Sequence, residues 1–259
     1  MSTTSHIAID APTGIRLVRR PLTSDLTVTE VVRAVRDDRH PVALSGSWFG
    51  SRAVVASEPV VVSEGPADED PFDLLDAVAE IPRSDPGGGV HGGWIGNLGY
   101  RCGRLVERLP DGPTRPVPSP DWWLGYYDHV LHLDSEGRWW FEALWTPARE
   151  RTLEHRYAIL AARLDAPAPD PRPFACGPFS MRPSPLSHQA AVRTAIEHIE
   201  AGDIYQANVC LRLEAPLVGD ALDLWSSGVE RLGSPYAAFI DQGDSRAVAS
   251  LSPERFLRR

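Results

Sequence analysis

The sequence predicts an α+β fold built on antiparallel sheets. The candidate strands arrive in pairs across short turns, as the strands of hairpins do, and the candidate helices stand between these pairs. The glycine-rich stretch GGGVHGG at 87–93 lacks G-x-G-x-x-G spacing and is not followed by Lys-Ser/Thr, so it predicts a loop without a phosphate-binding role. The pattern therefore favours an α+β fold over a Rossmann fold.

The N-terminal region begins with strands expected at 42–44 and 53–56 across a Gly/Ser turn. A helix is expected over 71–81, with the acidic residues 68–70 at its start and apolar residues on one face. Strands at 122–134 and 138–145 flank a turn at 135–137 and predict a hairpin. The periodicity of the residues after this hairpin predicts a helix over 151–164.

The proline-rich segment 166–186 is expected to be a linker or a long surface crossing. We therefore divide the chain into an N-terminal region (1–165), this segment, and a C-terminal region (187–259). In the C-terminal region, Ser187 is expected to cap a helix that ends at Gly202 and carries Val192, Ile196 and Ile199 on its apolar face.

Three further elements are expected after that helix. A strand over 204–213 comes first, followed by a helix around 221–232. Two strands across the turn DQGD, at 236–240 and 246–252, complete a hairpin. No internal repeat interrupts this order.

Composition limits the classes of function. The net charge is −9 over 259 residues, and all 26 basic residues are arginine, which argues against a nucleic-acid or anionic-membrane surface and excludes a lysine nucleophile. Three cysteines without C-x-x-C spacing indicate reduced thiols. We expect no signal peptide and no membrane span, and therefore a cytoplasmic protein.

The strand expected over 204–213 has an unusual polar face. Gln206 and Asn208 share that face with Arg212, whereas Tyr205 and the aliphatic residues alternate on the other. Uncharged amides of this kind are typical of pockets that orient a polar small molecule. By spacing alone, an ordinary solvent-facing strand is an equally good interpretation.

The expected C-terminal hairpin ends in a residue pattern suited to proton transfer. Pro253 stops the hydrogen-bond ladder and leaves Glu254 at a strand end, where a carboxylate can face a cleft and act as a general acid or base. By contrast, His129 and His132 are three residues apart on one strand, so they face opposite sides. We expect them to be core or surface histidines that share no metal ion.

Three stretches carry a resemblance to a known family. AGDIYQANVCLRL (201–213), GSPYAAFI (233–240) and SLSPERFL (250–257), in this order, resemble the chorismate-utilising enzymes. The pattern is most similar to aminodeoxychorismate synthase component I and next to anthranilate synthase component I. Looser matches, such as GGWIGNLGYRCGRLVERLP (92–110), extend the resemblance over nearly the whole chain.

This resemblance implies two antiparallel sheets packed face to face with helices outside. It implies Mg²⁺-dependent replacement of the 4-hydroxyl of chorismate by ammonia, which a glutamine amidotransferase subunit supplies, with Glu254 as the acid/base residue. It also implies a tryptophan pocket between the sheets. The positions that match this pocket are Ser45, Phe49, Gly50, Ser51, Arg52, Pro235, Tyr236 and Ala237.

Alternatives remain at this pocket and for the chain as a whole. Ser45 is equally well explained as a turn residue, and Trp48 and Phe49 could fill the pocket themselves. The family's chains continue well past the SPERF motif, and the metal ligands lie in that continuation, so we expect this chain to be truncated and to leave strands unpaired. A non-catalytic remnant, or a module that binds tryptophan or the amidotransferase, is therefore the alternative from another class.

Overall fold

The computed structural model describes residues 14–76, 89–108, 110 and 119–258. The chain divides into two compact units: Met1–Pro171 together with Leu224–Arg259, and the segment Arg172–Asp223. The division of the sequence at 165/166 and 186/187 stays a prediction. No helix of the described part is long and apolar enough to span a membrane.

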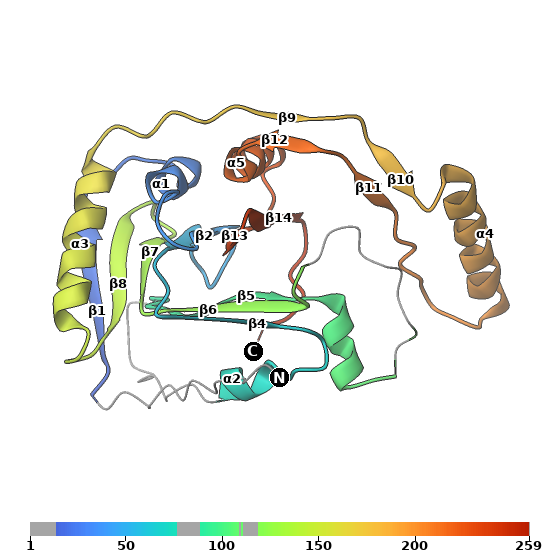
Figure 1. Ribbon diagram of the computed structural model, residues 1–259, viewed down its shortest axis with the longest axis horizontal. Coiled ribbons are helices and arrows are strands. Elements are labelled where there is room, and N and C mark those ends of the chain that lie inside the picture. The colour runs from blue at the N-terminus through green and yellow to red at the C-terminus, as the bar shows by residue number, and fades with distance from the viewer. Residues whose placement is uncertain (1–13, 77–88, 109, 111–118, 259) are drawn as a thin grey trace. The chain divides into compact units, whose positions relative to one another are not determined.

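The first unit contains a large antiparallel sheet of seven strands among the described residues (Figure 1). In spatial order these strands are β1 (Arg16–Leu22), β8 (Trp139–Trp145), β7 (His129–Leu133), β3 (Ala53–Ala56), β2 (Val42–Gly46), β13 (Tyr236–Gly243) and β14 (Arg246–Ser252). The strands expected at 42–44 and 53–56 and the C-terminal hairpin are confirmed. The first and last parts of the chain thus meet in one sheet, through the pairing of β2 with β13.

A smaller antiparallel sheet packs against the larger one. Its strands are β4 (Val61–Gly65), β6 (Trp122–Tyr127) and β5 (Gly93–Leu98). Leu44 and Val54 of the larger sheet share a buried cluster with Trp123 and Tyr127 of the smaller one. The two sheets therefore enclose a common apolar core, and the predicted α+β fold with face-to-face antiparallel sheets is confirmed.

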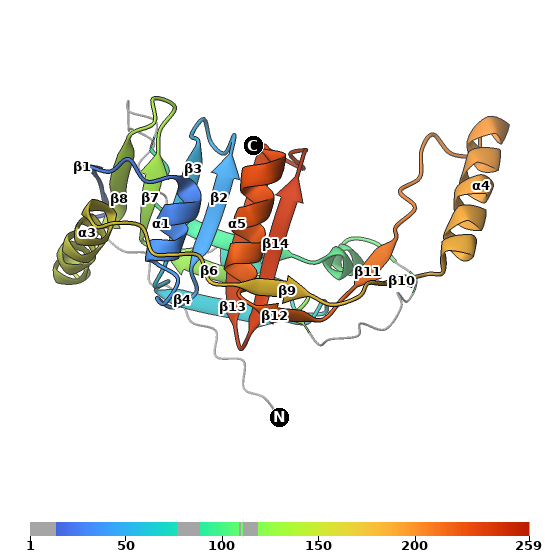
Figure 2. The same ribbon diagram turned by 90° about the horizontal axis from the view of Figure 1, so that it is seen from above.

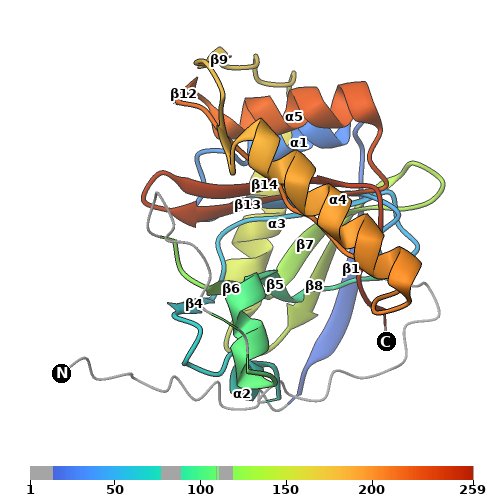
Figure 3. The same ribbon diagram turned by 90° about the vertical axis from the view of Figure 1, so that its right-hand side faces the viewer.

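Helices cover the outer faces of this two-sheet core (Figures 2 and 3). The helices of the first unit are α1 (Val28–Ala34), α2 (Phe72–Asp76), the 3₁₀ helix η1 (Tyr100–Leu105), α3 (Glu150–Asp165) and most of α5 (Ala221–Leu232). The side chain of Trp225 in α5 packs on Phe239 of β13, and Leu75 of α2 packs under the smaller sheet. Residues 77–81 of the expected 71–81 helix lie outside the described residues.

The hairpin expected over 122–145 needs one correction. Its first arm is two strands, because the chain leaves the smaller sheet after Tyr127 and enters the larger sheet at His129. Asp128, between them, is buried and bonds to Arg149 and to the ring of His129. Only β7 and β8 form the hairpin, because strand-like residues on both sides of Asp128 do not by themselves reveal a change of sheet.

The second unit is small and mostly exposed. Its elements are β9 (Phe174–Cys176), β10 (Ser180–Arg182), α4 (Pro185–Ala201), β11 (Arg212–Glu214) and β12 (Leu217–Gly219). The side chain of Ser184, and not that of Ser187, caps α4 by accepting the Ser187 N–H, because Pro185 occupies the first helical turn. Gly202 ends the helix in the left-handed region, as expected.

The strand expected over 204–213 is wrong for most of its length. Residues 204–211 have no regular structure, and only Arg212 and Leu213 belong to β11, which pairs with β10. Alternation of side chains makes a strand only where a neighbouring strand accepts the backbone hydrogen bonds. In the described residues no such strand lies beside 204–211.

Candidate functional site

The candidate site lies where three neighbouring strands of the larger sheet reach one end. Ser45 of β2 pairs with Ala237 of β13, and Tyr236 pairs with Ser252 of β14. Gly46 has a φ of 112°, and a Cβ atom there would overlap the carbonyl of Pro235. Glycine thus permits the close approach of two segments that are almost two hundred residues apart in sequence.

The predicted tryptophan-pocket residues are brought together, but they lie on both faces of the sheet. Leu44 and Ala238 face the core between the sheets. Ser45 and Ala237 are each one residue along and therefore face the helices. Consistent with this direction, Ser45 lines a cavity of about 370 Å³ with residues of α1 and α5. A ligand between the sheets would meet Tyr236 and not the side chain of Ser45.

An aromatic pair occupies the face of the sheet end that looks toward the smaller sheet. The ring of Trp48 meets that of Tyr236 edge-on, with centroids 5.8 Å apart, and Trp48 also packs against the core between the sheets. The indole N–H of Trp48 donates to the carbonyl of Ser45 at 3.2 Å. The contact supports the interpretation that Trp48 itself fills this position.

The turn between β2 and β3 carries the other predicted pocket residues. Phe49 is 64% exposed and has a φ of 53°, and Gly50 follows with a φ of 78°. The hydroxyl of buried Ser51 donates to the carbonyl of Trp48. Arg52 bonds through its backbone to Gly46 and to Leu133. Phe49 is therefore a large apolar side chain of this turn that a ligand can reach.

Glu254 lies next to the same strand ends. It follows β14 by two residues, and Ser252, the last residue of that strand, pairs with Tyr236. The backbone N–H of Glu254 donates to the Ser252 hydroxyl at 3.2 Å, and this hydroxyl donates to the Glu254 carbonyl at 2.8 Å. The turn holds the backbone, and the carboxylate of Glu254 is exposed and makes no hydrogen bond within the part of the chain that the structure describes.

Gln206 and Asn208 belong to the other unit of the chain. Both lie in the irregular, exposed stretch of the second unit, whose position relative to the first unit is not determined. Their predicted role in a substrate pocket stays a prediction. The shared polar face that motivated it does not exist, since these residues do not form a strand.

Sequence reasoning missed a buried charged cluster in the first unit. Glu142 is fully buried, and its carboxylate accepts the N–H groups of Val90 and His91 at 2.6 and 3.0 Å and Nδ1–H of His132 at 2.8 Å. Burial raises the pKa of Glu142, but the bonds from His132 and the two N–H groups outweigh burial and lower it. Glu142 is the one charged residue in the otherwise apolar run 139–145, and this position could have indicated that it is buried.

Comparisons with known proteins identify the family of the chain. A model of the family described as chorismate binding enzyme matches residues 40–259. The chain belongs to this family. The matched region contains the strand ends that meet at Ser45, Tyr236 and Ser252.

The chain is similar to two curated members of related function. It is 30% identical over 199 residues to aminodeoxychorismate synthase component 1 of Salmonella typhimurium, which covers 73% of this chain and 41% of that protein. It is 31% identical over 179 residues to anthranilate synthase component 1 of Thermus thermophilus, which covers 64% of this chain and 36% of that protein. The chain thus spans less than half the length of these relatives.

Solved structures of the family share the fold. Anthranilate synthase component I from Streptococcus pneumoniae aligns with a TM-score of 0.61 at 23% identity, over 78% of this chain and 50% of the other. The menaquinone-specific isochorismate synthase from Escherichia coli aligns with a TM-score of 0.54 at 12% identity, over 95% and 51%. At these identities the likeness concerns the fold alone.

The described residues do not fit a magnesium ion by themselves. They contain no group of three or more His, Cys, Asp or Glu side chains that could hold a metal ion. Mg²⁺ binds through carboxylates in near-octahedral geometry, and Glu254 offers a single carboxylate at the candidate site. Glu254 alone therefore does not form a magnesium site.

Proposed function

We propose that this chain is part of an enzyme that aminates chorismate to 4-amino-4-deoxychorismate, with ammonia from a glutamine amidotransferase subunit. The proposal rests on Glu254 of the SPERF motif, which follows the strand residue paired with the first residue of β13 and is exposed. Similarity to aminodeoxychorismate synthase component 1 over 73% of the chain supports it. The product would serve para-aminobenzoate and folate synthesis.

In this proposal, Glu254 acts as general acid and then as general base while ammonia replaces the hydroxyl group of the substrate. A protonated carboxyl can donate to the departing hydroxyl oxygen, and the resulting carboxylate can accept a proton from the incoming ammonia. The turn at Ser252 fixes the backbone from which the side chain extends. The family implies Mg²⁺ as a cofactor, which would need ligands besides Glu254.

Formation of anthranilate is the second candidate. The chain is 31% identical to anthranilate synthase component 1 of Thermus thermophilus, a likeness as close as that to the aminodeoxychorismate enzymes. The longest open reading frame that contains this chain should be expressed and incubated with chorismate, Mg²⁺ and ammonium. Chromatography of the products decides between the two, because 4-amino-4-deoxychorismate supports the proposal and anthranilate alone contradicts it.

Glu254→Gln tests the acid/base role in the same protein. The amide keeps the shape of the side chain but cannot exchange the proton, so we expect kcat to fall by about 10²–10⁴. The melting temperature should change little, because the carboxylate is exposed. Near-normal amination by this variant would remove Glu254 from the mechanism.

A ligand-binding role without catalysis is tested separately. Calorimetry with tryptophan and with chorismate, each with and without Mg²⁺, measures what the protein binds. Chorismate binding that requires Mg²⁺ favours the enzyme. Tryptophan binding alone favours a binding module, and Trp48→Ala should then change the affinity, since Trp48 occupies the predicted pocket beside Tyr236.

A further inference from the structure

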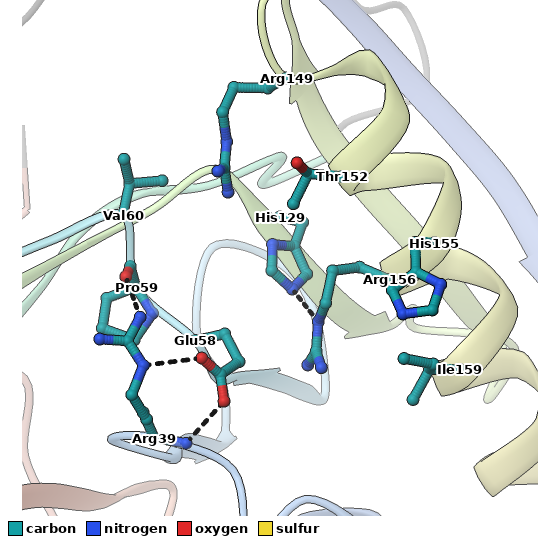
Figure 4. Close-up of a pocket in the computed structure, with 10 residues that line it drawn as sticks. All are labelled: Arg39, Glu58, Pro59, Val60, His129, Arg149, Thr152, His155, Arg156 and Ile159. Atoms are coloured by element: carbon teal, nitrogen blue, oxygen red, sulfur yellow. Dashed lines mark hydrogen bonds and ion pairs between the residues drawn. The ribbon is translucent and has the colours of Figure 1, made fainter.

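A second cavity lies at the opposite ends of the strands that form the candidate site. Arg39 precedes β2, Glu58 follows β3, and His129 begins β7, so these residues lie at the end of the sheet away from Gly46. The cavity has a volume of about 360 Å³ and is closed on its other side by α3 (Figure 4). It is therefore separate from the site around Glu254.

Arginine side chains outnumber carboxylates in the lining of the cavity, although the protein as a whole has a net charge of −9. Its lining contains three arginines, Arg39, Arg149 and Arg156, and one carboxylate, that of Glu58. Glu58 is already bound, because it accepts the backbone N–H of Arg39 at 2.9 Å and its Nε–H at 2.8 Å. The other two arginines, Arg149 and Arg156, pair with Asp128 and Asp38, and neither of these carboxylates lines the cavity.

Buried acceptors fix these two arginines from behind. Asp128 holds Arg149 through a single bond to Nε at 2.8 Å. Asp38 and Ser57 hold a terminal nitrogen of the buried Arg156 at 2.8 and 2.9 Å. In the described part of the chain, the two terminal nitrogens of Arg149 have no hydrogen-bond partner. They are thus positioned as a pair of donors directed at the cavity, as Figure 4 shows.

The ring of His129 links Asp128 to Arg156 through hydrogen bonds. Its Nδ1–H donates to Asp128 at 2.8 Å, and its Nε2 accepts from Nε–H of Arg156 at 3.3 Å. These two bonds on opposite sides of the ring fix its orientation between Asp128 and Arg156. Burial raises the pKa of Asp128, but the bonds from His129 and Arg149 outweigh burial and lower it, so the Asp128 carboxylate stays charged.

Residues on one face of helix α3 form another wall of the cavity. Thr152, His155, Arg156 and Ile159 follow the spacing of adjacent turns and line the cavity together. A hydroxyl, an imidazole and a guanidinium on one face are the groups that bind oxyanions in proteins. The apolar contribution of Ile159 suits a ligand with a small carbon skeleton as well.

We propose that this cavity binds a small oxyanion, a carboxylate or a phosphate, through the terminal nitrogens of Arg149 with support from His155 and Thr152. Arg149 presents two parallel donors, which is the geometry that a carboxylate or phosphate group accepts in bidentate form. The volume lies at the lower end of the range for small-molecule pockets and suits a ligand of few atoms.

Titration calorimetry with inorganic phosphate and, separately, with malonate tests this site in the full-length protein, at constant ionic strength set by chloride. We expect saturable binding of at least one anion, and which of the two binds identifies the source. Arg149→Gln should weaken binding by about tenfold to a hundredfold. Arg151→Gln removes an exposed charge of the same helix that does not line the cavity, and it should bind as the unmodified protein does.

Arg149→Gln also leaves Asp128 without its ion pair to Arg149 and could impair folding. A second variant therefore tests the site without breaking this pair. His155→Ala keeps that pair and should weaken binding severalfold, with an unchanged circular dichroism spectrum. Saturable binding to neither anion overturns the proposal. So does binding of unchanged affinity in both Arg149→Gln and His155→Ala, because the anion would then be held elsewhere.

Discussion

Helices α3 and α4 have nearly equal length and similar apolar spacing, but different surroundings. In α3, Leu153, Leu160 and Leu164 are buried. In α4 no residue is buried, and Ile196 and Ile199 are 48% and 41% exposed. Both helices were expected from periodicity, so periodicity predicts that a helix forms but not what covers its apolar face.

The same difference separates the two units. The first unit encloses a core between two sheets, whereas Arg172–Asp223 forms short strand pairs with exposed side chains. Stability should therefore be concentrated in the first unit, where truncating a side chain leaves a cavity. Substitutions of matched chemistry in the two units measure this contrast.

The largest effect is expected from truncating an aromatic side chain of the core. Trp123 is fully buried between the sheets, and Tyr205 of the second unit is 92% exposed. Trp123→Ala should lower the free energy of unfolding by about 3–5 kcal/mol. Tyr205→Ala should change it by less than about 0.5 kcal/mol. Urea unfolding followed by circular dichroism measures both, and equal losses would contradict the contrast.

Breaking an ion pair should likewise cost more stability in the first unit than in the second. Asp38 joins the buried Arg156 and also Arg163, whereas Asp203 pairs with His198 on the surface. Asp38→Asn should destabilise by about 3 kcal/mol, because Arg156 would be left buried without its counter-charge. Asp203→Asn should cost less than about 1 kcal/mol. The same unfolding measurement applies, and a large effect of Asp203→Asn would show that α4 is covered in solution.

Two glycines in the left-handed region give a sharper test of packing. Gly46 approaches the Pro235 carbonyl, whereas a Cβ atom on Gly202, at the end of α4, would meet nothing within 4 Å. Gly202→Ala should cost about 1 kcal/mol through backbone strain alone. Gly46→Ala adds the clash to the strain and should cost about 2–3 kcal/mol. Thermal unfolding compares them, and a smaller cost for Gly46→Ala would mean that β2 and β13 separate easily.

The smallest effect is a change in acid sensitivity. Burial raises the pKa of Asp134, but bonds from the Arg138 backbone, Trp140 and the Arg138 side chain outweigh burial and lower it to about 2. A carboxylate with a lowered pKa stabilises the fold above its unfolded value of about 4, and this contribution is lost as pH falls toward 2. The melting temperature should therefore fall less steeply between pH 4 and pH 2 in Asp134→Asn. An unchanged slope would show that other carboxylates dominate.

Sequence reasoning placed the elements well where neighbours in the chain are also neighbours in space. The hairpin β13–β14 was predicted because its two strands and its turn are contiguous, and α3 because its apolar residues recur with helical spacing. Reasoning of this kind failed at 204–211, because alternating side chains cannot show whether a partner strand is present. It also failed at Asp128, where a stretch expected as one strand divides between two sheets.

The sequence alone determined the α+β class, the family resemblance and the motif that contains Glu254, because these depend on local periodicity and on residues close together in the chain. Only the tertiary structure decided that Ser45 and Tyr236 share a sheet end but face opposite sides. It also decided that Arg149, His129 and Arg156 meet around one cavity. These relations depend on strand pairing and helix packing between distant segments, and the burial and hydrogen bonds that fix them arise only when those segments meet.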